Sequence, residues 1–305
     1  MGTALTEIAD GVALLPVSIA NVYMVGKPGS AWVLVDTGLP GNVRRIREAV
    51  DARFGPGARP TSIVLTHGHA DHSGNARELA DLWKVPVYAH RLELPYLTGK
   101  SLYPPPDPTA PGFMAFMSRF FSPQTEDLGD RVRNLQEGLP VPGMNGWDWH
   151  FTPGHAPGHV SYFRTSDATL LAGDAFTTMN VDSLLACITK RKRISRPPTP
   201  INYDWKLCAE SVRKLDALNP LTFACGHGMP MSGPDAADQF TWFAEHFPVP
   251  SHGRYVAESA QTSAEGVVYL PPPPADPLPG IAGTIGVATL AGIMVAVAAR
   301  RRASL

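Results

Sequence analysis

A dense cluster of metal-capable side chains constrains the fold of this 305-residue chain more than any other feature. The segment Thr66–His72 has the sequence THGHADH and follows Ser62–Leu65, a short apolar run typical of a buried strand. His67 and His69 are two residues apart, so both point to one side of an extended backbone. Imidazole nitrogen suits zinc, iron or manganese, and carboxylate oxygen suits a second cation. The sequence therefore predicts a metal site where a strand ends in a loop.

Three further candidate ligands stand in the second half of the chain, each at the end of a predicted strand: His155, Asp174 and His227. The strands predicted before them span residues 147–152, 169–172 and 222–224. An α/β sheet usually places its site at this edge. A glycine beside each candidate lets the backbone bend sharply. We therefore expect the two halves of the chain to converge on one site.

Hydrophobic periodicity predicts a mixed α/β chain with strands and helices in both halves. The remaining strands are expected at residues 12–17, 22–25, 31–35, 62–66, 85–89 and 160–164. Helices are expected at residues 42–55, around 76–83, at 205–218 and at 235–247. The apolar N-terminal stretch lacks a basic region before it and contains a proline, so we do not expect it to be a signal peptide.

Composition narrows the partners of the protein. The net charge of −1 gives no basic surface for nucleic acid, and the short run Lys190–Arg193 is interpreted as a solvated loop. Three cysteines occur, with no CxxC pair among them. Such a sparse, odd set fits a reducing compartment and argues against a disulfide framework. We expect a small-molecule substrate.

Residues 91–146 interrupt the alternation of strands and helices and are predicted to form an inserted segment. Its proline-rich part, Tyr103–Pro108, is incompatible with a helix or a central strand. The stretch Phe113–Phe121 that follows has helical spacing, with one apolar face formed by Phe113, Phe116, Met117, Phe120 and Phe121. This face has two interpretations: ordinary core packing, or a lid over the site for an apolar part of the substrate.

The C-terminal residues have a different composition from the 1–250 region, which we predict to be the catalytic domain. Residues 251–280 are expected to form a proline-rich linker that includes Pro271–Pro274. Residues 281–299 carry no charge and no proline and are predicted to be a transmembrane helix, followed by a basic tail at 300–305. The alternatives are a small-residue helix that packs on the domain or pairs with a second copy. We expect a cytoplasmic catalytic domain anchored to a membrane by this helix.

Taken together, the motifs resemble the metallo-β-lactamase fold superfamily over about residues 5–250. The resemblance rests on five segments in a fixed order: Val35–Gly38 (VDTG), Thr66–His72 (THGHADH), Thr152–His155 (TPGH), Gly173–Asp174 (GD) and Gly226–Gly228 (GHG). It implies an α/β fold, specifically an αββα sandwich with a dinuclear metal site at its rim.

The resemblance also implies a role for each candidate residue. One ion would be held by His67, His69 and His155, the second by Asp71, His72 and His227, with Asp174 bridging the two. Asp36 would orient a ligand from outside the coordination sphere. His159 would likewise be a supporting or structural residue and not a ligand. The cofactors would be two divalent metal ions, zinc first, with iron or manganese as alternatives.

The implied activity is metal-dependent hydrolysis, with Asp71 and Asp174 as catalytic residues. Two cations about 3.5–4 Å apart can share a water and turn it into a hydroxide that attacks a carbonyl or phosphoryl centre. The resemblance is to the branch near the lactonases and glyoxalase II, although Ala175–Thr178 match neither group's characteristic residues. An ester, lactone or thioester is the expected substrate. The alternatives are a mono-iron persulfide dioxygenase, a phosphodiester or β-lactam hydrolase, and a membrane-tethered binding module.

Overall fold

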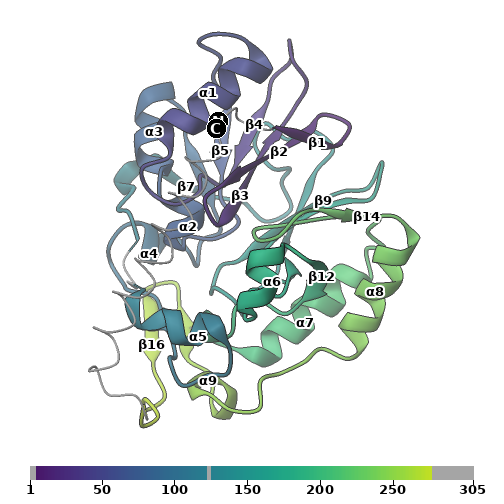
Figure 1. Cartoon of the computed structure of the whole chain (residues 1–305). Helices are drawn as coiled ribbons and strands as arrows, with labels where there is room; N and C mark the ends of the chain where they lie inside the picture. The colour runs from purple at the N-terminus through teal and green to yellow at the C-terminus, as the bar shows by residue number, and fades with distance from the viewer. Residues whose placement is uncertain (1–4, 122–124, 277–305) are drawn as a thin grey trace, which may run out of the picture. The chain divides into compact units, whose positions relative to one another are not determined.

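Two β-sheets form the centre of the computed structural model, which describes residues 5–121 and 125–276 (Figure 1). In the described residues the first sheet has seven strands in chain order: β1 Thr6–Ala9, β2 Val12–Val17, β3 Ala20–Val25, β4 Val33–Val35, β5 Ser62–Val64, β6 Val87–Ala89 and β7 Val132–Asn134. The second has five in the order β14-β13-β10-β9-β8: β8 Asp148–Phe151, β9 Val160–Arg164, β10 Thr169–Gly173, β13 Thr222–Cys225 and β14 Met231–Ser232.

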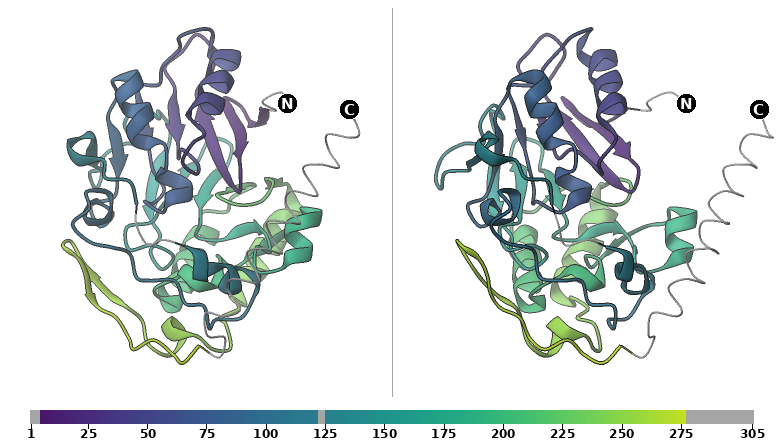
Figure 2. Two further views of the ribbon diagram at one scale, coloured as in Figure 1. Left: turned by 60° about the vertical axis from the view of Figure 1, so that its left-hand side comes forward. Right: turned by 90° about the vertical axis from the view of Figure 1, so that its left-hand side faces the viewer.

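Helices cover the outer face of each sheet, which completes four layers (Figures 1 and 2). On the first sheet, α1 (Val43–Phe54) and α3 (Ala76–Trp83) bury their apolar sides, including Ile46 and Leu79, against the strands. On the second, α7 (Trp205–Asp216) and α8 (Pro234–Glu245) do the same. A third apolar cluster fills the space between the sheets. The predicted αββα sandwich is therefore confirmed.

The central strands are apolar on both faces because both faces are covered. The four residues Val33, Val35, Val64 and Leu171 pack between the sheets, while the side chains that alternate with those of β4 and β5 face the outer helices. This explains why the sequence shows short continuous apolar runs and not a strict alternation. The strands predicted at 12–17 and 160–164 have those bounds in the structure.

The segment 91–146 is integrated more deeply than a separate insertion would be. Its last part forms β7, which pairs in parallel with β6, and Leu97 and Leu128 are buried in the core of the first sheet. The segment also contains α4 (Leu94–Leu97), α5 (Phe113–Met117) and the short 3₁₀ helices η1 (Ser118–Phe120) and η2 (Gly129–Arg131). The proline-rich part has no helix or strand, as predicted.

The apolar face predicted for Phe113–Phe121 does not enter the core. The buried positions of α5 and η1 are Ala115 and Ser118, whereas Phe116 is half-buried and Phe120 is 44% exposed. Phe120 is the one exposed member of the predicted face; the other four are partly buried and belong to none of the apolar core clusters of the described residues. The backbone N–H of Phe113 donates to the carbonyl of Asp182 at 2.8 Å, which attaches the helix to the second half of the chain.

The compact unit continues past residue 250 and ends at Pro272. It includes α9 (Arg254–Ala257) and the hairpin of β15 (Gln261–Ser263) and β16 (Gly266–Tyr269), and buried Tyr255 packs in one cluster with Trp205. The predicted linker thus overlaps folded structure. Apolar residues between 251 and 270 pack against the rest of the domain. The predicted transmembrane helix and basic tail lie outside the described residues. Within the described ranges, no helix is both long and apolar enough to span a bilayer.

Two buried tyrosine hydroxyls join the sheets. Tyr162 of β9 donates to the carbonyl of Leu65 at 2.8 Å, directly before the histidine loop. Tyr23 of β3 donates to the carbonyl of Cys225 at 2.6 Å, two residues before His227. Each bond therefore fixes a loop of the site relative to the opposite sheet.

We predict that Tyr162→Phe lowers the free energy of unfolding by about 1–2 kcal/mol, because it removes a buried hydrogen bond and leaves the Leu65 carbonyl without this donor. Urea denaturation followed by circular dichroism measures the change. The matched control is Tyr88→Phe, which alters a half-buried tyrosine whose hydroxyl bonds to no other described residue. Equal stabilities of the two variants would contradict a role for the inter-sheet bond.

Candidate metal centre

Loops from both sheets converge on one point at the edge of the sandwich. His67 and His69 follow β5, and the short helix α2 (Ala70–Ser73) then carries Asp71 and His72. The remaining three candidates follow strands of the second sheet or the loop between them: His155 lies between β8 and β9, Asp174 after β10 and His227 after β13. The structure thus brings together all seven side chains that the sequence singled out.

The seven side chains fall into groups with the geometry of metal sites. The ligand atoms of each group lie within 4.8 Å of one another: His67, His69 and His155; His67, His72 and Asp174; Asp71, His72 and His227. The first and third groups are the two ligand sets implied by the family resemblance. Asp174 shares its group with one histidine from each set, so it lies between them.

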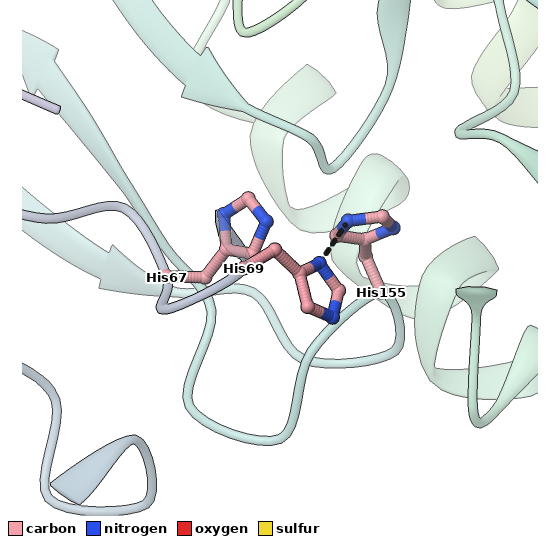
Figure 3. Close-up of side chains that lie close together, drawn as sticks. All are labelled: His67, His69 and His155. Carbon is pink, nitrogen blue, oxygen red and sulfur yellow. Dashed lines mark hydrogen bonds between the residues drawn. The ribbon is translucent and has the colours of Figure 1, made fainter. Parts of the chain in front are cut away.

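Short distances connect the members of the centre. Nδ1 of His69 lies 3.1 Å from Nε2 of His155 (Figure 3). Nε2 of His227 lies 3.3 Å from Oδ2 of Asp71 and 3.1 Å from Oδ2 of Asp174. The same Asp174 oxygen is 3.5 Å from Nε2 of His155. A carboxylate between two groups of imidazoles is an arrangement suited to holding two cations close together.

Three buried atoms at the centre have no hydrogen-bond partner among the described residues: Nε2 of His67, Nε2 of His72 and Oδ1 of Asp174. Burying a polar atom without a partner costs about 1–3 kcal/mol, and native proteins rarely leave several such atoms together. All three are typical metal-ligand atoms, and they belong to one of the groups above. The residues therefore fit a metal centre.

A second buried carboxylate, Asp36, orients the first two of these atoms. Its Oδ2 accepts from Nδ1 of His72 at 2.8 Å and from the Thr66 hydroxyl at 2.8 Å, and its Oδ1 accepts from the Thr66 backbone N–H at 2.8 Å. The Thr66 oxygen lies 3.1 Å from Nδ1 of His67. Because Nδ1 of each ring donates a hydrogen bond, Nε2 carries the lone pair that is free to bind a metal ion. Asp36 has φ of 60°, a left-handed conformation that aspartate adopts more readily than most residues.

Other supports were not predicted from the sequence. Nδ1 of His155 lies 2.8 Å from Oδ1 of Asn202, and Nδ1 of His227 lies 2.8 Å from the carbonyl of Ile19. Neither partner has a local sequence signal, since one is a single asparagine and the other a backbone carbonyl. His159 accepts from the backbone N–H of Asp174 at its Nε2, 2.8 Å away. This nitrogen is therefore occupied, and His159 supports the Asp174 turn.

The charges of the centre favour cations. Burial lowers the pKa of His67 well below its usual range, helped by His72 and His69. Burial acts in the same direction on His72, but Asp174, Asp71 and Asp36 outweigh it and raise its pKa to about 9. The pKa of Asp174 lies well below its usual range despite burial, because His227 and His72 stabilise the carboxylate. Protons and metal ions therefore compete for these groups.

Glycine at position 226 is required by close packing. A Cβ atom there would clash with Oδ1 of Asp174 and Cε1 of His72. The backbone of Gly226 also donates to the Gly173 carbonyl at 2.8 Å, which joins the loops after β10 and β13. A side chain at this position would push the two loops apart. Steric exclusion therefore explains why the residue before His227 is glycine.

Glu93 is a further residue that sequence analysis missed. Its side chain is fully buried, and its two oxygens accept from the backbone N–H of Gly68 at 2.7 Å and of Gly158 at 2.6 Å. The hydroxyl of Tyr103, whose ring packs on His69, donates to the same carboxyl. Burial raises the pKa of Glu93 to about 7. One carboxyl group thus connects the His67–His69 loop to the loop that contains His155.

Comparison with known proteins finds relatives whose descriptions agree with a metal centre. A family model described as "Metallo-beta-lactamase superfamily" matches residues 15–227. The Bacillus subtilis (strain 168) protein named "Probable metallo-hydrolase YflN" is 39% identical over 241 residues, which cover 78% of this chain and 91% of that protein. A second protein of the same strain, named "Probable metallo-hydrolase YybB", is 30% identical over 203 residues, which cover 66% of this chain and 78% of that protein.

Solved structures share the fold. The metallo-beta-lactamase family protein TTHA1429 from Thermus thermophilus superposes with a TM-score of 0.54 at 20% identity, covering 79% of this chain and 80% of the other. The archaeal metallo-beta-lactamase superfamily protein ST1585 from Sulfolobus tokodaii gives 0.53 at 20% identity, covering 77% and 85%. At such identities the likeness concerns the fold alone.

We predict that Glu93→Gln weakens metal binding by about tenfold or more, the usual cost of losing a partner outside the coordination sphere. The amide of glutamine keeps one acceptor oxygen, but its NH₂ group cannot accept the second hydrogen bond from the backbone N–H groups of Gly68 and Gly158. Competition with a chelator, read by the metal content of the protein, measures the affinity. The control is Glu78→Gln, at an exposed position of α3. Unchanged metal affinity with lowered thermal stability would show that Glu93 stabilises the fold but does not support metal binding.

Proposed function

The chain belongs to the metallo-beta-lactamase superfamily, and we propose from this premise that its centre holds two divalent cations and cleaves a small ester, lactone or thioester. The protein is a metal-dependent hydrolase with a His/Asp centre. The observation that carries the finer proposal is the cluster of three buried ligand atoms without a hydrogen-bond partner among the described residues, on His67, His72 and Asp174. They belong to both ligand sets and to the carboxylate between them.

We assign His67, His69 and His155 to one ion, Asp71, His72 and His227 to the other, and Asp174 to both. Zinc suits this mixture of imidazole and carboxylate, and iron or manganese are the alternatives. When bound, such a pair of ions lowers the pKa of a water shared between them and polarises the oxygen of the scissile group.

The protein supplies fixed positions and a dry interior. Asp174 is 1% exposed, and its backbone N–H is held by His159, so its carboxylate has little freedom to move. Asp71 is more open, with a side chain that is 20% exposed. We therefore give Asp174 the role of fixing the spacing of the centre. Asp71 lies on the more accessible side of the centre, and we propose that it holds the second ion where the substrate approaches.

The substrate class is inferred from the half-exposed aromatic face of α5. The start of this helix is tied to residues beside the centre: the carbonyl of Pro111 accepts from the hydroxyl of Thr199 at 2.8 Å. Thr199 begins the 3₁₀ helix η3 (Thr199–Ile201), which precedes Asn202, the partner of His155. Aromatic and methionine side chains outside the core, on a segment that these bonds connect to the support of His155, suit an apolar acyl part. An apolar acyl part is the reason why we propose a substrate of the kind that the lactonase and glyoxalase II branch cleaves.

We predict that Asp174→Asn lowers kcat by more than the ~10–100-fold that loss of a supporting residue costs, with a smaller effect on KM. The carboxylate acts on the geometry of the reacting centre and not on the docking of the substrate. Steady-state kinetics on panels of lactones, thioesters and phosphodiesters, together with elemental analysis, provide the measurement. We expect two metal ions per chain in the wild type and fewer in the variant.

The control for this experiment is Asp167→Asn, a surface aspartate paired with Arg164, which should leave both quantities unchanged. One ion at saturation would overturn the dinuclear assignment. Oxygen uptake with a persulfide, in an iron-loaded protein that hydrolyses none of the panel, would identify the mono-iron dioxygenase instead.

We predict that Phe116→Ala and Phe120→Ala weaken long-chain acyl substrates more than short ones. Each methylene that is no longer buried should cost about 0.8 kcal/mol of binding. The measurement is kcat/KM along a series of chain lengths. Leu139→Ala, at a residue that is 53% exposed, is the control for the loss of a surface aliphatic group. Equal effects on short and long chains would exclude α5 from substrate binding.

A further inference from the structure

A short helix carries exposed aliphatic residues that the hydrolytic centre does not use. Helix α6 (Leu184–Thr189) lies between β11 (Thr177–Met179) and β12 (Lys192–Ser195), which pair as an antiparallel hairpin (Figure 1). No residue of α6 is buried, and Leu184, Leu185 and Ile188 are 48%, 70% and 70% exposed. Their spacing of i, i+1 and i+4 places them on one side of the helix. Figure 2 shows α6 projecting from the domain.

A run of four basic residues follows the helix immediately. Lys190 takes a left-handed conformation with φ of 52°, which ends α6 and turns the chain into Arg191 and then β12. All four side chains of Lys190–Arg193 are exposed, and none forms an ion pair with a carboxylate of the described residues. Lys192 donates to the carbonyl of Pro230 at 2.9 Å. The chain as a whole has a net charge of −1, so this positive charge is local.

The combination of these two features selects one kind of partner. Exposed aliphatic side chains gain from entering an apolar phase, and adjacent lysine and arginine gain from nearby negative charge. A second copy of this chain would place its own basic run against this one. A nucleic acid would match the charge but offer nothing to the three aliphatic residues. An anionic lipid bilayer matches both, with acyl chains beneath a layer of phosphate.

We propose that the α6 tip, defined as Leu184, Leu185, Ile188 and Lys190–Arg193, docks on the surface of an anionic membrane. The aliphatic residues enter the interfacial region, and the basic residues bind lipid phosphates. This is peripheral binding by an element of the folded domain. It is separate from the membrane-spanning helix predicted for residues 281–299, which lie outside the described residues.

The α6 tip is attached to the metal centre by its hairpin. The backbone N–H of Thr178 in β11 donates to the carbonyl of His227 at 3.2 Å. The residue before the helix cap, Asp182, accepts from the backbone of Phe113 in α5. Docking therefore holds the His227 loop and the aromatic face of α5 close to the bilayer. The consequence that an amphiphilic substrate reaches the centre from the membrane rests on the proposed function, whereas the docking itself does not.

The test is binding of the purified full chain to vesicles of phosphatidylcholine with 30% phosphatidylglycerol, measured by sedimentation. The charge-reversed variant Lys190→Glu/Arg191→Glu should bind at least about 25-fold more weakly, from roughly a factor of five for each basic residue lost. Leu185→Ser/Ile188→Ser should also weaken binding. The matched control is Arg45→Glu/Arg47→Glu, which makes the same charge change at exposed positions of α1. Hydrolysis of a soluble substrate should not change in any of these variants.

Hydrogen exchange locates the contact. Residues 184–193 should exchange more slowly in the presence of the anionic vesicles and not in the presence of pure phosphatidylcholine. Binding that is equal in the wild type and all variants, with unchanged exchange at 184–193, would overturn the proposal and assign any membrane affinity to another part of the chain. Because neither measurement needs turnover, a failure of the hydrolase assignment would leave the docking result standing.

Discussion

The buried carboxylate of Asp36 is the interaction on which the metal centre depends most. It accepts three hydrogen bonds and thereby fixes the start of the Thr66–His72 loop and the ring of His72. Through the Thr66 hydroxyl it also reaches His67. An ionised carboxylate is costly to bury unless its oxygens are satisfied. Here the donors to Asp36 are Thr66 and His72, which belong to the loop that must be oriented. One residue therefore stabilises the fold and fixes the direction of two ligand atoms, Nε2 of His67 and Nε2 of His72.

The centre depends equally on the contact between the two sheets. One sheet supplies the loop with His67, His69, Asp71 and His72, and the other supplies His155, Asp174 and His227. Neither half holds a complete set, because each implied ion site needs at least one ligand from the second half. The tyrosine hydroxyls between the sheets and the Glu93 bridge between the loops therefore hold the two halves of the candidate centre together. A small displacement of one sheet would separate the ligands by more than a metal ion tolerates.

The elements to which our proposals assign specificity are short and have few buried residues. Helices α5 and α6 have few buried residues, and both are tied to the chain near Asp182. Such segments are free to carry specificity, because changes in them cost little core stability. In our proposals, α5 selects the acyl part of the substrate and α6 places the enzyme at an anionic surface. The same scaffold and centre could then act on different substrates, and the surface helices would determine the substrate specificity.

Much of the fold could be predicted from local patterns. The strands at 12–17 and 160–164 and the helices near 43–54 and 205–216 follow from apolar runs and helical spacing, since these signals arise from covering a face of the chain. The edge strand β7 was missed, because three residues with two exposed side chains carry no clear signal. The folded part between 251 and 272 was missed because it packs on the rest of the domain through only a few apolar residues.

The sequence by itself determined which candidate ligands the chain offers and their position at strand ends, since the density of histidine and aspartate beside glycine has little use other than metal binding. Only the tertiary structure decided which atoms face the centre and what holds them. Asn202, the Ile19 carbonyl and Glu93 lie 47, 208 and 25 residues from the groups they support. Such partners leave no local pattern, because hydrogen bonds across a folded chain depend on distance in space and not on spacing in the sequence. For the same reason, the stripe of α5 could be recognised as apolar, but only the folded structure showed that none of its residues joins an apolar core cluster.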